Sequence, residues 1–223
     1  MKLNGVHSVK LEDLRMSVAT DRSHCTTFVL KPICLINKSK YFYKRKYLDR
    51  SEMKRDVVRI KVFYYKRGFR ETQVDTVVTD RGKDKVAVDF NIVEGPPTLV
   101  SALDVVQTQP VLTEQEITRR VVLTKGTPLN LLRLDTTVVL LQQSLWDKGY
   151  ADAVVDTTIT LDSAGRSGAI QVSLDPKSKT TIGEILIEGE DNVSERTLRK
   201  SLTMTPGEVF RRAELLRSQR ALY

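Results

Sequence analysis

The chain contains a unit that recurs about every 80 residues, and this repeat constrains the fold more than any single motif. Residues 111–126 (VLTEQEITRRVVLTKG) align with residues 192–207 (NVSERTLRKSLTMTPG) after a shift of 81 positions. An earlier copy begins at the N-terminus, where Gly5 corresponds to Gly189. A small repeated module favours an array of binding domains over one large catalytic cavity.

The second copy, residues 96–176, begins with a strand and two helices. Residues 98–107 are apolar and rich in β-branched side chains, which predicts a strand. Thr113 and Glu116 form a Thr-x-x-Glu capping box, typical of a helix start. A longer helix is predicted over residues 130–148, because apolar residues recur three and four positions apart on one face. These residues are Leu134, Val138, Leu141 and Leu145.

After that helix the apolar period changes to two, which predicts a β-hairpin over residues 152–174. One face of its first strand would hold Ala153, Val155, Thr157, Ile159 and Leu161. The unit is therefore predicted to have the order β-α-α-β-β. Its fold class would be α+β, with a three-stranded mixed sheet whose apolar face is covered by two helices.

The first copy, residues 1–95, repeats this order with an insertion at residues 21–48. Asp49 and Glu52 form another capping-box pattern, which predicts the start of its second helix. The run 94–97 (EGPP) predicts a short, stiff junction before the second copy, because consecutive prolines restrict the backbone.

The third copy, residues 177–223, is partial. It is expected to start with a strand at residues 184–189 and to stop within its second helix. Since the first copy also begins inside its first strand, we interpret the sequence as a fragment of a longer protein. No apolar run approaches the roughly 18–20 residues that span a bilayer.

The net charge of +8 is unevenly distributed. Residues 1–70 contain 18 Lys or Arg and 6 Asp or Glu, a balance of +12, whereas the rest contains 18 and 22, a balance of −4. A basic N-terminal part favours anionic partners or is a solvated face without a partner. The basic surface predicted in the insertion consists of Lys40, Lys44, Arg45 and Lys46. Cys25 and Cys34 could form a disulfide in an oxidising compartment and would be two thiols in a reducing one.

Several stretches of the sequence resemble the polypeptide-transport-associated (POTRA) domain. In the first copy these are residues 56–69 and 90–97, and in the second copy residues 145–154. In the third copy they are residues 182–189 and 206–223. The resemblance is to the outer-membrane protein assembly family, of the BamA and TamA type. It implies a POTRA array at the periplasmic face of the outer membrane that binds unfolded outer-membrane proteins and docks accessory periplasmic or lipoprotein subunits.

The resemblance also implies where a peptide would bind. In the family the second strand of each unit lies at an edge of the sheet, which here corresponds to residues 72–79 and 152–161. An open edge can pair with an extended peptide through its backbone, unless the intact protein covers it. The predicted peptide-binding residues are Thr72, Val74, Thr76, Val78, Asp152, Val154, Asp156, Thr158 and Thr160.

Other classes of function fit the sequence less well. A KH-like nucleic-acid module would need a Gly-x-x-Gly loop between its helices, and the junctions at residues 125–128 and 206–209 have one glycine each. His7 and His24 lie in no metal or general-base pattern, so we expect no enzyme, no metal and no cofactor. Within the family, the alternative is the POTRA region of a two-partner secretion transporter. Membrane lipid headgroups remain a further candidate partner for the basic surface.

Overall fold

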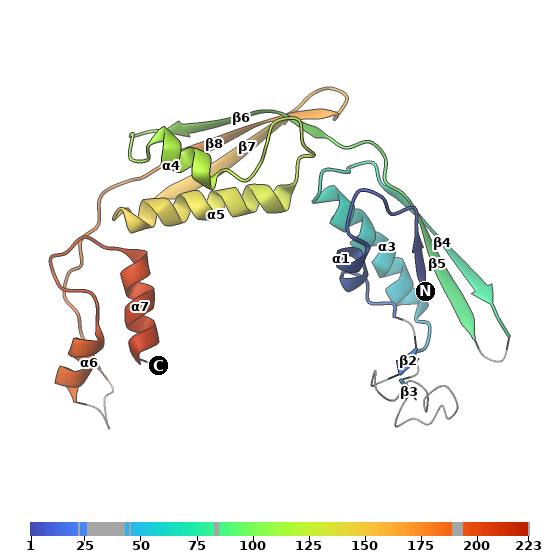
Figure 1. Ribbon diagram of the computed structural model, residues 1–223, viewed down its shortest axis with the longest axis horizontal. Helices are drawn as coiled ribbons and strands as arrows, with labels where there is room; N and C mark the ends of the chain where they lie inside the picture. The colour runs from blue at the N-terminus through green and yellow to red at the C-terminus, as the bar shows by residue number, and fades with distance from the viewer. Residues whose placement is uncertain (22, 26–42, 45, 83–84, 189–193, 223) are drawn as a thin grey trace. The chain divides into compact units, whose positions relative to one another are not determined.

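The computed structural model describes residues 1–21, 23–25, 43–44, 46–82, 85–188 and 194–222 (Figure 1). The chain forms two compact units, Met1–Thr98 and Leu99–Tyr223. Among the described residues, no helix combines the length and the apolar character needed to cross a bilayer.

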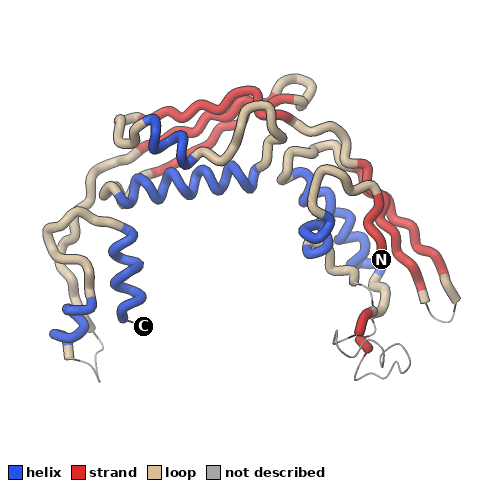
Figure 2. Tube along the Cα trace, viewed as in Figure 1, coloured by secondary structure: helices blue, strands red, loops and turns tan. Residues whose placement is uncertain are grey.

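The first unit contains a three-stranded sheet in the order β1-β5-β4, with β1 parallel and β4 antiparallel to the central strand. Its helices lie on one face of that sheet (Figure 2). A separate antiparallel pair, β2 and β3, lies in the insertion. The elements are β1 (Lys2–Asn4), α1 (Leu11–Met16), β2 (His24–Cys25), β3 (Tyr43–Lys44), α3 (Arg50–Tyr65), β4 (Gln73–Asp80) and β5 (Val86–Val93).

The predicted capping box of α3 is only half formed. The Asp49 side chain accepts hydrogen bonds from the backbone N–H groups of Ser51 and Glu52, as an N-cap should. The Glu52 carboxylate does not accept the reciprocal hydrogen bond from the Asp49 backbone N–H group. It instead pairs with Arg55 and Arg59, which lie one and two turns further along the helix. The two guanidinium groups therefore outcompete the neutral backbone N–H group for this carboxylate.

The second unit repeats the architecture, and its sheet confirms the predicted mixed, three-stranded α+β fold. The strand order is β6-β8-β7, with β6 parallel and β7 antiparallel to β8. Both helices of this copy lie on the same face of the sheet (Figures 1 and 2). The elements are β6 (Leu99–Gln107), α4 (Glu114–Arg120), α5 (Leu131–Asp147), β7 (Val154–Leu161), β8 (Ser167–Asp175), α6 (Glu195–Ser201) and α7 (Arg212–Leu222).

Local signals in the sequence explain where these helices begin. At α4 both bonds of the capping box are present, since the Thr113 side chain accepts from Glu116 N–H and the Glu116 carboxylate accepts from Thr113 N–H. At α5 the Asn130 side chain caps the first turn. Leu134, Leu141 and Leu145 of the predicted stripe are buried, whereas Val138 is only half-buried.

The strand expected at residues 184–189 does not form over the described residues 184–188. Only an isolated bridge joins Thr181 to Val209. In the second copy the first strand, β6, is held by β8, the last strand of its unit. Among the described residues 177–188 and 194–222 the structure has no strand beside residues 184–188, so no ladder forms there.

One buried polar contact recurs in all three copies. Asp56, Thr137 and Ser218 are spaced 81 residues apart and are all buried, with side-chain oxygens that accept a backbone N–H from the segment after the first helix. The donors are Ala19 and Thr20 for Asp56 (2.9 and 2.7 Å), Val122 for Thr137 (3.0 Å) and Thr203 for Ser218 (2.8 Å). Each bond ties the chain after the first helix to the second helix. Because the three copies use three different residue types at this position, an alignment of their sequences does not reveal the shared contact.

Candidate functional site

The outer strand β7 presents an open edge in the second unit. Among the strands that the structure describes, β7 pairs with β8 alone, and the register from Val154 opposite Asp175 to Leu161 opposite Gly168 contains no bulge. Proteins often protect such an edge with lysine, proline or a bulge. The strand sequence VVDTTITL contains neither lysine nor proline. Among these barriers β7 has neither lysine, proline nor a bulge, and its one charged residue is Asp156.

The hydrogen bonds of the hairpin show which backbone groups of β7 are open. Asp162 N–H donates to the Ser167 carbonyl, which defines a hydrogen-bonded pair just beyond the strand. Pairs of this kind alternate along an antiparallel ladder. The backbone groups of Val154, Asp156, Thr158 and Thr160 therefore face β8. Those of Val155, Thr157, Ile159 and Leu161 face away from the sheet.

The first unit has the equivalent edge at β4. Arg81 N–H donates to the Lys85 carbonyl, so the same alternation turns the backbone groups of Val74, Thr76 and Val78 away from β5. These three residues lie 81 positions before Val155, Thr157 and Ile159. Like β7, β4 contains neither lysine nor proline. The two units thus expose the same stretch of backbone at equivalent positions.

The two groups of predicted residues occupy different places at these edges. Val74, Thr76 and Val78 are half-buried on the helix-covered face and carry open backbone groups. Val154, Asp156, Thr158 and Thr160 place exposed side chains on the opposite face, while their backbone groups pair with β8. Sequence reasoning did not name Val155, Thr157, Ile159 and Leu161 among the peptide-binding residues, although they carry the outward-facing backbone groups of β7. Their equivalence to the residues of β4 was visible in the repeat spacing.

Two predicted residues lie outside the strands. Thr72 precedes β4 and is buried, and its single hydroxyl hydrogen is shared between the carbonyl oxygens of Phe69 (3.1 Å) and Glu94 (2.9 Å). Thr72 therefore holds the turn that leads into the edge strand. Asp152 lies before β7 and is exposed.

The Glu94 carboxylate stabilises the fold of the first unit, which contains the edge strand β4. It accepts hydrogen bonds from the N–H groups of His7 and Ser8, the Ser8 hydroxyl and the Tyr64 hydroxyl. Burial alone would raise the pKa of Glu94, but these hydrogen bonds outweigh burial and lower the pKa below its ordinary value. Burial, together with the neighbouring Glu94 carboxylate, raises the pKa of Tyr64. Glu94 thus joins the segment after β1 to α3.

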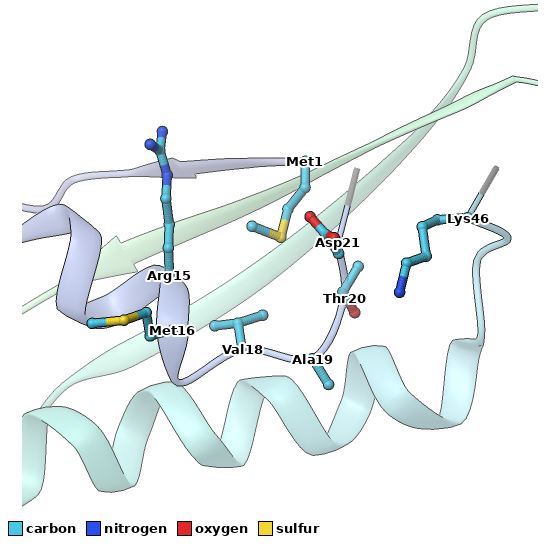
Figure 3. Close-up of a pocket in the computed structure, with 8 residues that line it drawn as sticks. All are labelled: Met1, Arg15, Met16, Val18, Ala19, Thr20, Asp21 and Lys46. Carbon is cyan, nitrogen blue, oxygen red and sulfur yellow. The ribbon is translucent and has the colours of Figure 1, made fainter. Parts of the chain in front are cut away.

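The predicted basic surface is only partly described. Lys44 and Lys46 are exposed, whereas Lys40 and Arg45 lie outside the described residues. Lys46 also lines a hollow of about 400 Å³ together with Arg15 and Asp21 (Figure 3). Cys34 and the Cys25 side chain lie outside the described residues, so the disulfide stays a prediction. Within the described part of the chain, no group of three or more His, Cys, Asp or Glu residues could hold a metal ion.

Comparison with known proteins gives matches over nearly the whole chain. The family described as "POTRA: Surface antigen variable number repeat" matches residues 2–95, 99–177 and 180–223. A candidate outer membrane protein assembly factor of Treponema pallidum (strain Nichols) is 19% identical over 204 residues, which cover 89% of this chain and 24% of the relative. The outer membrane protein assembly factor BamA of Neisseria meningitidis serogroup B is 23% identical over 180 residues, covering 76% of this chain and 22% of the relative.

Among solved structures, the crystal structure of POTRA domains 3–5 of Haemophilus influenzae BamA has the same fold. It is 17% identical, with a TM-score of 0.59, and the match covers 99% of this chain and 83% of that structure. This chain spans less than a quarter of the length of the two curated relatives.

Proposed function

Because this chain belongs to the POTRA family, we propose that it is the polypeptide-receiving part of an outer-membrane protein assembly factor and lies on the periplasmic side of the membrane. Its clients would be unfolded outer-membrane proteins, which pair as an added strand with β4 and β7. Accessory periplasmic or lipoprotein subunits would dock on other faces of the same array. The relatedness to assembly factors of Treponema and Neisseria supports this proposal.

The observation that carries the proposal is the repeated open edge. At β7 the backbone groups of Val155, Thr157, Ile159 and Leu161 face away from the sheet, and no bulge interrupts the strand. Backbone pairing depends little on the client's sequence, so one edge strand can bind many different β-strands. Each added hydrogen bond contributes only about 0.5–1.5 kcal/mol net, so a client can be released again.

We would test the proposal by NMR titration of the full 223-residue chain with a peptide that copies an outer-membrane β-strand. The amide signals of residues 155–161 and 74–80 should shift. The variant Thr157→Pro removes one outward N–H group without removing a bond to β8, because proline is tolerated on the free side of an edge strand. We expect it to weaken binding at β7 about threefold to tenfold, the equivalent of one backbone hydrogen bond.

Thr158→Val is the matched control. Thr158 has an exposed side chain on the same strand, but its backbone faces β8, so this variant should bind like the wild type. Equal binding by Thr157→Pro and the wild type, or shifts that avoid both edges, would refute pairing at these strands. Shifts of equal size with a scrambled peptide would show that the edge accepts extended chains in general.

We further propose that the exposed lysines of the insertion, Lys44 and Lys46, contact anionic lipid headgroups. Co-sedimentation with vesicles that contain anionic lipid should fall for the double variant Lys44→Glu, Lys46→Glu. The double variant Lys54→Glu, Lys61→Glu makes the same charge change on exposed positions of α3. Equal losses from the two double variants would show a general effect of net charge and contradict a local lipid contact.

A further inference from the structure

The sheet of the second unit has another edge, at β6, and this edge borders a hollow. The hollow has a volume of about 670 Å³ and lies between β6 and α4. Its apolar lining consists of Leu103 and Val105 from β6, Ile117 from α4, and Val121 and Leu123 from the segment that follows. All except Leu123 are half-buried. The hollow can therefore receive apolar side chains that approach along the strand.

The hydrogen bonds of β6 leave backbone groups open beside this hollow. Thr108 N–H donates to the Leu174 carbonyl, and the residues of a parallel strand alternate in the side to which their backbone groups point. The backbone groups of Leu103, Val105 and Gln107 therefore face away from β8. They lie on the same outer side as the hollow, which Leu103 and Val105 also line.

The chain itself already pairs with the start of this edge. Val100 N–H donates to the Thr127 carbonyl, and Gly126 N–H donates to the Val100 carbonyl, both at 2.8–2.9 Å. At the other end, the Gln107 side chain is hydrogen-bonded to the backbone of Leu112. The open stretch is thus limited to residues 103–107. Upstream of it, the backbone groups of Val100 are already bonded to the turn at residues 125–127.

The charge of the hollow indicates which segment would fit. Its charged lining residues are Asp104 and Glu114, both of which are exposed and acidic. A partner strand that pairs with β6 would point alternate side chains toward the apolar lining. Lysine or arginine at the intervening positions would point to the opposite face of the sheet, where Asp104 lies, because Asp104 alternates with Leu103 and Val105 along β6.

We propose that the groove between β6 and α4 binds one short extended polypeptide segment in which apolar residues alternate with lysine or arginine. The second unit would then hold chain segments at both edges of its sheet. This inference rests on the proposed function only in taking the ligand to be an extended polypeptide. It does not require binding at β7.

The test uses the full chain and a synthetic peptide of alternating valine and lysine, about seven residues long, the length of an ordinary strand. A nitroxide on the peptide should broaden the amide signals of Leu103, Val105 and Gln107. A peptide of alternating valine and glutamate should bind at least tenfold more weakly. N-methylation along the pairing side of the Val-Lys peptide should abolish the broadening, because it removes the backbone donors.

Protein variants then locate the charge effect. The double variant Asp104→Lys, Glu114→Lys should weaken binding of the Val-Lys peptide about tenfold. The matched double variant Asp135→Lys, Asp147→Lys changes the charge equally at exposed positions of α5 and should leave the affinity within twofold.

Equal affinity in the wild type and the Asp104→Lys, Glu114→Lys variant would overturn the proposal. Broadening confined to residues 155–161 would also overturn it, while leaving the proposed function of β7 intact. Broadening at residues 103–107 alone would support this inference and count against peptide binding at β7.

Discussion

Replacing Thr137 with valine tests the buried contact that recurs in the three copies. Thr137 is fully buried in α5, and its hydroxyl oxygen accepts a hydrogen bond of 3.0 Å from Val122 N–H. Valine has nearly the same shape, so Thr137→Val changes the packing very little. It removes the acceptor and leaves the Val122 N–H group without its partner in a partly buried position.

An unsatisfied N–H group costs about 1–3 kcal/mol of folding free energy when it is buried, and the upper end is a limit for Val122, whose residue is 39% exposed. For a unit of this size, we expect the melting temperature to fall by roughly 3–6 °C for each kcal/mol lost. The Thr137 hydroxyl also donates to the Arg133 carbonyl, one turn earlier in the same helix. That carbonyl lies inside a helix and has a backbone partner, so the loss of this second bond adds little.

Native-state hydrogen exchange of the Val122 amide is the direct assay. Its rate reports the protection of this one N–H group, whether or not the two units unfold together. A loss of 1–3 kcal/mol should accelerate exchange roughly 5- to 150-fold. Thr136→Val is the matched control: Thr136 is the adjacent residue of α5, exposed, with a hydroxyl that also donates to a carbonyl one turn earlier. We expect this control to change stability by less than about 0.5 kcal/mol. If Thr137→Val and Thr136→Val exchange alike, the bond to Val122 does not stabilise the unit.

Two further perturbations address other parts of the chain. Burial opposes ionisation of Asp56, but hydrogen bonds hold the pKa of Asp56 below its ordinary value. The ionised carboxylate therefore stabilises the folded first unit at pH values above about 3.9, the pKa of aspartate in the unfolded chain. This stabilisation is lost as the pH falls through the lower pKa of Asp56 in the folded chain. The urea midpoints of the wild type and Asp56→Asn should therefore differ at pH 6 and converge below about pH 4, and a constant difference would contradict this role. Gly149 has a φ of 97°, and a β-carbon there would collide with the Val209 side chain. Gly126 has a similar φ of 80°, but a β-carbon there would meet no atom within 4 Å. Gly149→Ala should therefore lower the melting temperature of the second unit more than Gly126→Ala does. Equal melting temperatures of the two variants would exclude the collision.

The sequence alone determined the order and approximate limits of the elements in the two fuller copies. The capping box at Thr113, the apolar stripe of α5 and the change of period after Gly149 are all local signals. They involve residues within one or two turns, or alternate residues of one strand, so they can be read before any partner is known. The repeat spacing extended this reading to the first copy, and the resemblance to the family followed from it.

Only the tertiary structure decided which backbone groups are open at the sheet edges. Periodicity places Val155 and Asp156 on opposite faces of a strand, but it does not say which of them turns its N–H and carbonyl groups outward. That choice depends on the side on which β8 lies, and therefore on pairing between residues distant in sequence. The same dependence explains the third copy, where residues 184–188 match a strand in sequence but have no strand beside them in the part of the chain that the structure describes.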